Sequence, residues 1–196
     1  TSTPTPTPSP EQLYAGASQA LEYGDYDSAT AGVAALLSLP FDPVQVQIGL
    51  GSSQLRAGDY AAAVLTLQAA VGAAGAAGAA PQAHILLADA LVGAGEPLAA
   101  AEQYRAYLSG STVITGYVQQ WLGDALTAGG DAAGAVEAYS AALSEPPDVS
   151  FEVGTRERLA LAHVALGDLA SALAQYDAIL AVARIDAHRA RIEYQA

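Results

Sequence analysis

The chain has 196 residues, of which 52% are hydrophobic but only 7% aromatic, so alanine supplies much of the apolar content. Its formal net charge is −13, and all seven basic residues are arginines. A chain this acidic lacks the basic surface that binds the phosphates of nucleic acids or an anionic membrane. No apolar run reaches the ~20 residues that insert across a bilayer, and the absence of cysteine excludes disulfides and thiolate chemistry.

Residues 1–10 alternate proline with threonine or serine. Because such a pattern forbids helix and favours an extended chain, we expect a disordered Thr/Pro-rich linker at 1–10 and a folded repeat domain over 11–196. The linker is interpreted as a tether between an anchor and the folded part; an unstructured end without a role is the alternative. Such spacers are typical of secreted or lipid-anchored bacterial envelope proteins, so we expect an extracytoplasmic location, or otherwise a cytoplasmic one.

From Glu11 onward a glycine-centred turn recurs at a nearly constant interval. The five turn glycines are Gly24, Gly58, Gly95, Gly130 and Gly167, separated by 34, 37, 35 and 37 residues. Glycine adopts the left-handed conformation that ends many helices, and the aspartate that follows four of the five can cap the next helix. A helix–turn–helix unit repeated at about 34 residues predicts a stack of antiparallel hairpins, an all-α fold.

The chain divides accordingly into five hairpins in order. The predicted helices are 11–23 and 27–38, 44–57 and 60–71, 81–94 and 97–108, 113–128 and 132–144, 151–166 and 169–182, and a last helix at 186–195. The Gly-Ala-Ala triplets of residues 72–80 are expected to lengthen the second hairpin and then form a loop. The last helix is interpreted either as a C-terminal capping helix, which solenoids need at their ends, or as the start of a sixth repeat.

The repeats resemble the tetratricopeptide repeat (TPR), here of bacterial type. The resemblance covers about residues 11–182, and the tryptophan that this family carries early in the repeat is missing from its usual place. Small residues occur at the family's close-packing positions of the first helix (Gly51, Ala88, Gly123, Ala160) and of the second helix (Ala29, Ala63, Ala100, Ala135, Ala172). We expect a bulky side chain at these positions to force the helices apart.

The resemblance implies a right-handed α-solenoid of about five hairpins whose first helices line the concave side. It also implies a non-catalytic scaffold that binds a peptide or protein segment in that groove, without cofactor or metal. The expected groove residues are Tyr14, Gln45, Ile48, Gln82, Ile85, Asp89, Tyr117, Gln120, Trp121, Asp124, Glu157 and Arg158. Aromatic side chains there would anchor the ligand and amides would bond its backbone. Alternatively, Tyr117 and Trp121 simply pack against the neighbouring hairpin.

Signals for catalysis are weak. The three histidines (His84, His163, His188) show no metal-ligand spacing, so a zinc site is not expected. Residues 49–53 (Gly-Leu-Gly-Ser-Ser) vaguely resemble a phosphate loop or a serine elbow but follow no predicted strand and contain no lysine. We therefore expect the chain not to be an enzyme.

A second functional hypothesis rests on the layout of the chain. A Thr/Pro tether followed by helical hairpins is similar to the non-catalytic superhelix that precedes the catalytic domain of soluble lytic transglycosylases. On this alternative the chain is the N-terminal helical part of a larger bacterial envelope enzyme and associates with peptidoglycan or envelope proteins.

Overall fold

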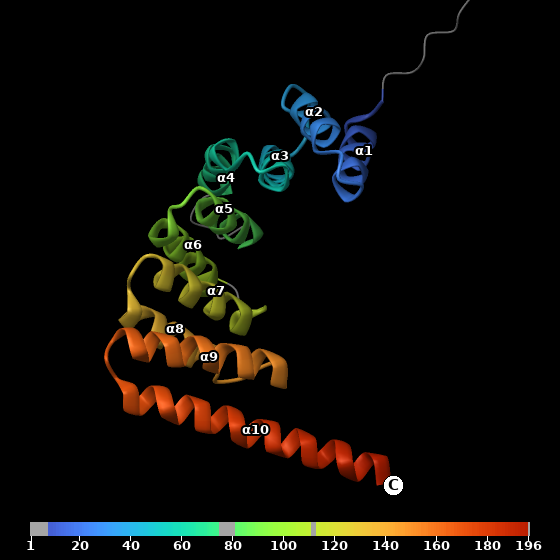
Figure 1. Ribbon diagram of the computed structural model, residues 1–196. Coiled ribbons are helices and arrows are strands. Elements are labelled where there is room, and N and C mark those ends of the chain that lie inside the picture. The colour runs from blue at the N-terminus through green and yellow to red at the C-terminus, as the bar shows by residue number, and fades with distance from the viewer. Residues whose placement is uncertain (1–7, 75–80, 111–112, 196) are drawn as a thin grey trace, which may run out of the picture. The chain divides into compact units, whose positions relative to one another are not determined.

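A computed structural model describes residues 8–74, 81–110 and 113–195. Within these ranges the chain forms ten α-helices and no strand (Figure 1). The helices are α1 (Pro10–Glu22), α2 (Tyr26–Leu36), α3 (Pro43–Ala57), α4 (Tyr60–Ala74), α5 (Pro81–Gly93), α6 (Pro97–Gly110), α7 (Thr115–Ala128), α8 (Ala132–Ala142), α9 (Val149–Ala165) and α10 (Leu169–Gln195). The prediction of an all-α array of helical hairpins is confirmed. Residues 75–80, most of the Gly-Ala-Ala stretch, lie outside the described ranges.

The helices divide into two compact units. The first comprises residues 1–96, with α1 to α5, and the second comprises residues 97–196, with α6 to α10. In the first unit α1 packs on α2 and α3 on α4, while α5 contacts both α4 and α3. In the second unit α7 packs on α8 and α9 on α10, and α7 also contacts α6 and α9. Each unit is thus a layered stack in which consecutive helices lie against one another.

The Gly-Asp turns have the geometry that the sequence predicts. All five turn glycines have φ between +77° and +82°. At Gly58 the backbone N–H donates to the Leu55 carbonyl and the Asp59 N–H donates to the Gln54 carbonyl, which caps the end of α3. The Asp59 carboxylate then accepts from the backbone N–H of Ala62 at 3.2 Å and caps α4. Asp25, Asp131 and Asp168 cap their helices in the same way.

Small residues allow the two helices of a hairpin to approach closely. A Cβ atom on Gly51 would overlap with the side chain of Leu67, and a Cβ on Gly123 would overlap with the ring of Tyr139. The alanines predicted for the second helices are buried, as are Ala88 and Ala160 on the first helices. The core is therefore built from alanine, leucine and tyrosine packed against backbone, as the sequence predicts for close helix contacts.

The prediction of a separate last helix at 186–195 is wrong. One helix, α10, runs without a break from Leu169 to Gln195. The links between earlier hairpins contain proline, as at Pro146 and Pro147, which ends a helix. The segment from Val182 to Asp186 contains neither proline nor glycine, so nothing interrupts the backbone hydrogen bonds there. Asp186 can cap a helix only where the preceding residues leave the helical conformation.

The first described helix begins close to the N-terminal end of the described residues. α1 begins at Pro10, and the Ser9 side chain accepts from the backbone N–H of Gln12 in a reciprocal capping box. Residues 1–7 lie outside the described ranges. Residues 49–53 lie inside α3, so their glycines serve helix packing and form no phosphate loop.

Candidate functional site

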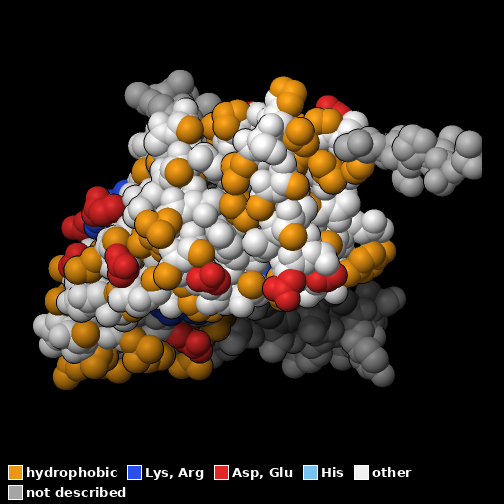
Figure 2. Space-filling view, turned by 90° about the horizontal axis from the view of Figure 1, so that it is seen from above, with side chains coloured by type: hydrophobic (Ala, Val, Ile, Leu, Met, Phe, Trp, Pro, Cys, Tyr) orange, Lys and Arg blue, Asp and Glu red, His pale blue; other side chains and the backbone are white. Residues whose placement is uncertain are grey.

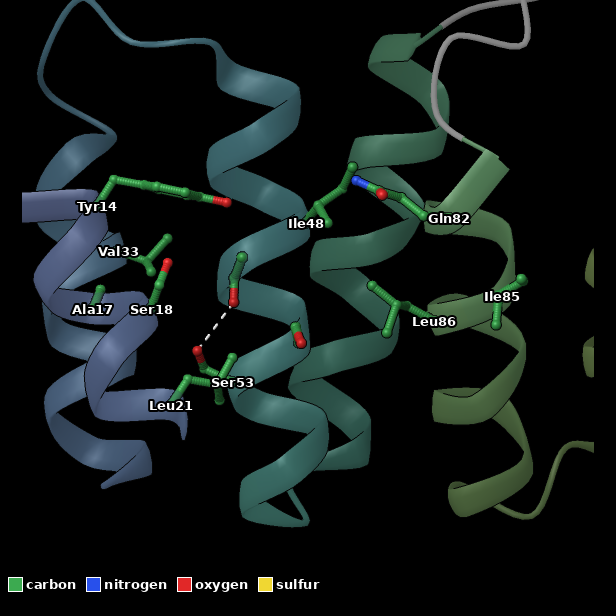
Figure 3. A pocket seen from close by; sticks show the side chains of 12 residues that line it. Tyr14, Ala17, Ser18, Leu21, Val33, Ile48, Ser53, Gln82, Ile85 and Leu86 are labelled. Atoms are coloured by element: carbon green, nitrogen blue, oxygen red, sulfur yellow. Dashed lines mark hydrogen bonds between the residues drawn. The ribbon is translucent and has the colours of Figure 1, made fainter. Parts of the chain in front are cut away.

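The first unit contains a cavity between three first helices. Its volume is about 340 Å³, and it is lined by residues of α1, α2, α3 and α5. The lining residues are Tyr14, Ala17, Ser18, Leu21, Val33, Ile48, Gly49, Ser52, Ser53, Gln82, Ile85 and Leu86. Figure 3 shows the Tyr14 ring extending from α1 toward α3, with Gln82, Ile85 and Leu86 on the opposite side.

The lining is apolar with a few hydrogen-bonding groups, and none of its residues carries a formal charge. The buried Ser53 hydroxyl donates to the Gly49 carbonyl at 3.0 Å, the bond dashed in Figure 3. A Cβ on Gly49 would lie 3.5 Å from both the Tyr14 ring and the Val33 side chain, so this glycine leaves the cavity open. Stacking on Phe41, with ring centroids 5.3 Å apart, holds the Tyr14 ring in place. Such a lining suits a ligand segment with an uncharged side chain and with a backbone that accepts and donates hydrogen bonds.

Four of the expected groove residues meet in this cavity. Tyr14, Ile48, Gln82 and Ile85 come from α1, α3 and α5. Two others from the first unit, Gln45 and Asp89, are exposed and lie outside the cavity lining.

In the second unit the expected aromatic residues form a cluster on α7. The Trp121 ring lies 6.2 Å from the Tyr104 ring and 6.4 Å from the Tyr117 ring, measured between centroids. Tyr117 also contacts Phe151 of α9 edge-on, at 5.0 Å. Both Tyr117 and Trp121 remain partly exposed. These rings therefore pack against the neighbouring helices and still present a surface.

The polar groups beside this cluster are bonded to one another. Asp124 accepts from the Tyr139 hydroxyl at 2.8 Å and from Arg158 Nε at 3.0 Å. Arg158 also donates to the Gly154 carbonyl at 3.0 Å. Burial raises the pKa of Tyr139 to about 12; hydrogen bonding from Thr127 opposes this shift, and Asp124 adds to it. This network joins α7, α8 and α9, and it gives Asp124 and Arg158 a structural role.

Gln120 is likewise engaged within the unit. Its amide Nε2 donates to the Thr155 hydroxyl at 2.6 Å, and that hydroxyl donates to the Phe151 carbonyl. Glu157, the remaining expected groove residue, is exposed on α9. The polar residues predicted for the second unit therefore mainly connect helices, whereas the first unit holds an open cavity.

Three of the cavity residues that sequence reasoning missed occupy the same repeat positions as residues that it chose. Ser18 and Ser52 precede their turn glycines by six residues, as Asp89 and Asp124 do, and Leu86 is the repeat equivalent of Trp121. Applying the repeat register uniformly, without regard to residue type, would have identified them. Ser53 and Val33 lie at packing positions and carry no such signal.

Among the described residues no group of three or more His, Asp or Glu side chains could hold a metal ion. His163 Nδ1 lies 3.5 Å from Asp168 Oδ2, at the last turn. None of the helices in the described ranges combines the length and apolar character needed to cross a membrane. On the face shown in Figure 2 acidic side chains are visible at several places, and little basic surface is visible.

The helical pairs, the Gly-Asp turns and the small packing residues agree with a known family model. Residues 48–113 match the model of the tetratricopeptide repeat. Over this stretch the chain is similar to tetratricopeptide repeats. The sequence-based resemblance is confirmed for this stretch, and the described helices form an array of hairpins of the same kind. No curated protein sequence matches the chain.

Solved structures of MamA, a TPR protein, show the same fold over most of both chains. A crystal structure of MamA is 20% identical, with a TM-score of 0.78, and the alignment covers 91% of this chain and 94% of that one. MamA from residue 41 onward of Desulfovibrio magneticus RS-1 is 15% identical, with a TM-score of 0.73 and coverage of 89% and 95%. MamA of AMB-1 is 17% identical, with a TM-score of 0.70 and coverage of 88% and 98%. At these identities the likeness concerns the fold.

Proposed function

We propose that the chain binds an extended peptide or protein segment in the cavity formed by α1, α3 and α5. The observation that carries this proposal is the 340 Å³ cavity itself, which brings Tyr14, Ile48, Gln82 and Ile85 together from three repeats. Stacked helical repeats commonly expose an extended binding surface of this kind.

The chemistry of the cavity narrows the ligand class. Its walls are apolar, so an aliphatic or aromatic side chain of the ligand would be buried there. Tyr14, Ser18 and Gln82 offer hydroxyl and amide groups at distinct points around the cavity, and these can bond the ligand backbone. Because the lining has no formal charge and the chain is strongly acidic overall, an uncharged or basic segment is favoured over an acidic one.

A random peptide library displayed on phage, selected against the full chain, tests this proposal. Selected peptides should bind the wild-type chain, and Ile85→Glu should weaken them at least about 10-fold by placing a charge in the apolar wall. Gln82→Ala, a change at an exposed position, should weaken them several-fold. Gln68→Ala on α4 is the matched control, since Gln68 is exposed and does not line the cavity.

The fluorescence of Trp121, the sole tryptophan, distinguishes binding at the second unit, where Trp121 lies, from binding at the first unit. Peptides bound in the first unit should compete with one another and depend on Ile85. If the selected peptides instead ignore Ile85→Glu and Gln82→Ala but shift Trp121 emission, the ligand site is the aromatic face of α7 and the proposal for the cavity is wrong.

A further inference from the structure

The second helix of the last hairpin exposes a position that every earlier hairpin buries. Nine residues after the turn glycine, the equivalent side chains are Val33, Leu67, Tyr104, Tyr139 and Tyr176. The first four are buried, Tyr139 to 2% exposure, whereas Tyr176 is 41% exposed. Within the second unit α6 is covered by α7 and α8 by α9, and α10 packs on α9 (Figure 1).

Part of the Tyr176 position faces its own hairpin, since Leu67 packs against Gly51 and Tyr139 against Gly123. Five residues after the turn glycine, Ala135 and Ala172 are both buried, because this position contacts the hairpin's own first helix. At the position of Tyr176 in earlier hairpins, Val33 and Tyr104 also contact the first helix of the following hairpin, Val33 beside Gly49 and Tyr104 beside Trp121. The exposed part of the Tyr176 side chain is therefore the part that a following helix covers elsewhere. An equivalent surface on α8 is covered by a helix.

The side of α10 on which Tyr176 is exposed carries a regular apolar stripe. Leu169, Leu173, Tyr176 and Leu180 follow one another at spacings of four, three and four residues, and they are between 41% and 65% exposed. Alternating steps of three and four residues are the spacing of a coiled-coil seam. Four such large apolar side chains in line are more than the scattered exposed leucines found on most surfaces.

The sequence continues the same spacing to the end of the helix. Positions 183, 187, 190 and 194 are Ala, Ala, Ala and Tyr. α10 has 27 residues, whereas the other helices have 11 to 17, and Figure 1 shows it extending past the first residues of α9. At 1.5 Å per residue it is about 40 Å long. The stripe is thus nearly four heptads long, with large residues in its first half and alanines in most of its second half.

We propose that α10 pairs with α10 of a second copy of this chain in an antiparallel, two-fold symmetric dimer. Antiparallel pairing places each large residue opposite a small one, which packs without voids. Leu180 then faces Ala183, Tyr176 faces Ala187 and Leu173 faces Ala190 of the second copy. Parallel pairing would instead stack three consecutive alanine layers and leave cavities, which are destabilising.

The charges beside the stripe favour the same arrangement. In an antiparallel pair in this register, Asp177 of one helix flanks Arg184 of the other, and the symmetry makes this pair twice. The same register brings no two like charges together beside the seam. In a chain with a net charge of −13, three of the seven arginines fall within residues 184–191. The one acidic residue of the first half of α10, Asp177, therefore lies beside the half of the other helix that carries the arginines.

Sedimentation equilibrium of the full chain tests the proposal, between about 1 and 100 µM. The wild-type chain should dimerise, and Leu173→Asp should raise the dissociation constant at least about 10-fold. Leu65→Asp is the matched control: Leu65 is 70% exposed on α4, so this change should leave the dimer intact. Circular dichroism verifies that both variants stay helical. A wild-type chain that is monomeric at 100 µM, or equal effects of the two variants, would overturn the proposal.

Charge exchange and cross-linking test the orientation. Asp177→Arg and Arg184→Asp should each weaken the dimer, and the double variant should restore it. Because the chain has no cysteine, chains carrying Tyr176→Cys mixed with chains carrying Ala187→Cys should form mixed disulfides on oxidation. Efficient cross-linking of Ala187→Cys chains with themselves would show a parallel pair and contradict the antiparallel arrangement.

Discussion

At the scale of single residues, two glycines of α7 differ in the space around them. A Cβ on Gly123 would overlap with the Tyr139 ring, whereas a Cβ on Gly116 would meet its nearest atom, the Ala142 carbonyl oxygen, at 3.8 Å. Gly123→Leu should therefore lower the free energy of unfolding by about 1–3 kcal/mol or more, through overpacking. Gly116→Leu should cost clearly less. Urea unfolding of both variants measures the difference; equal losses would show that the repeat register is not what selects glycine at 123.

The cap of α10 gives a pH dependence with a definite sign. Hydrogen bonds from the side chain and the backbone of Ser171, and a smaller effect of His163, hold the pKa of Asp168 below its usual value. A carboxyl with a lowered folded pKa stabilises the fold above its unfolded pKa, near 4, and loses this contribution as the pH falls through the folded value.

Asp168→Asn should therefore lower the melting temperature at pH 6, because asparagine caps the helix without the charge that favours its N-terminus. The difference in melting temperature between wild type and variant should shrink as the pH falls through the folded pKa of Asp168, because the wild-type carboxyl is then protonated as well. Glu137→Gln, which removes an exposed carboxylate from the middle of α8, controls for the loss of one negative charge. A difference that stays constant with pH would argue against the charged cap.

At the scale of elements, replacing glycine by alanine should lower the free energy of unfolding in a turn and raise it within a helix. Gly58 ends α3 with φ +82°, and Gly72 lies within α4; neither would place a Cβ within 4 Å of another side chain. Gly58→Ala should cost about 1–2 kcal/mol, because alanine resists the left-handed conformation. Gly72→Ala should raise the free energy of unfolding by about 0.5–1 kcal/mol, since alanine loses less backbone entropy than glycine on folding. Chemical unfolding of both variants tests this; a stabilising Gly58→Ala would exclude the strained turn.

The sequence predicts elements well where a local signal ends them. The ends of α3 and α7 follow from Gly58 and Gly130, because a left-handed glycine and an aspartate cap leave few alternatives. The continuity of α10 was missed because the repeat period suggested a new helix at Asp186. Local chemistry prevails there, since residues 182–186 contain no residue that breaks a helix.

The candidate site is predictable to the level of repeat positions. Ile48 and Ile85 share one position, and both line the cavity. The sequence does not reveal which polar side chains form hydrogen bonds within the fold. Gln120 and Arg158 were expected in the groove, but Gln120 donates to Thr155 and Arg158 donates to Asp124. Such pairs join residues 34 or 35 positions apart, and their geometry depends on how the repeats stack.

At the scale of the whole molecule, the charge balance governs stability. Twenty acidic and seven basic residues give a net charge of −13, and such self-repulsion disfavours the compact state. Raising NaCl from about 0.02 to 0.5 M shortens the Debye length from roughly 20 to 4 Å, so the repulsion is screened. The melting temperature at pH 7.5 should therefore rise with salt. The rise should diminish toward the isoelectric point of about 4.2, where little net charge is left to screen. Scanning calorimetry across both series measures this; a melting temperature that falls with salt at pH 7.5 would mean that attractive pairs such as Arg158–Asp124 outweigh the net charge.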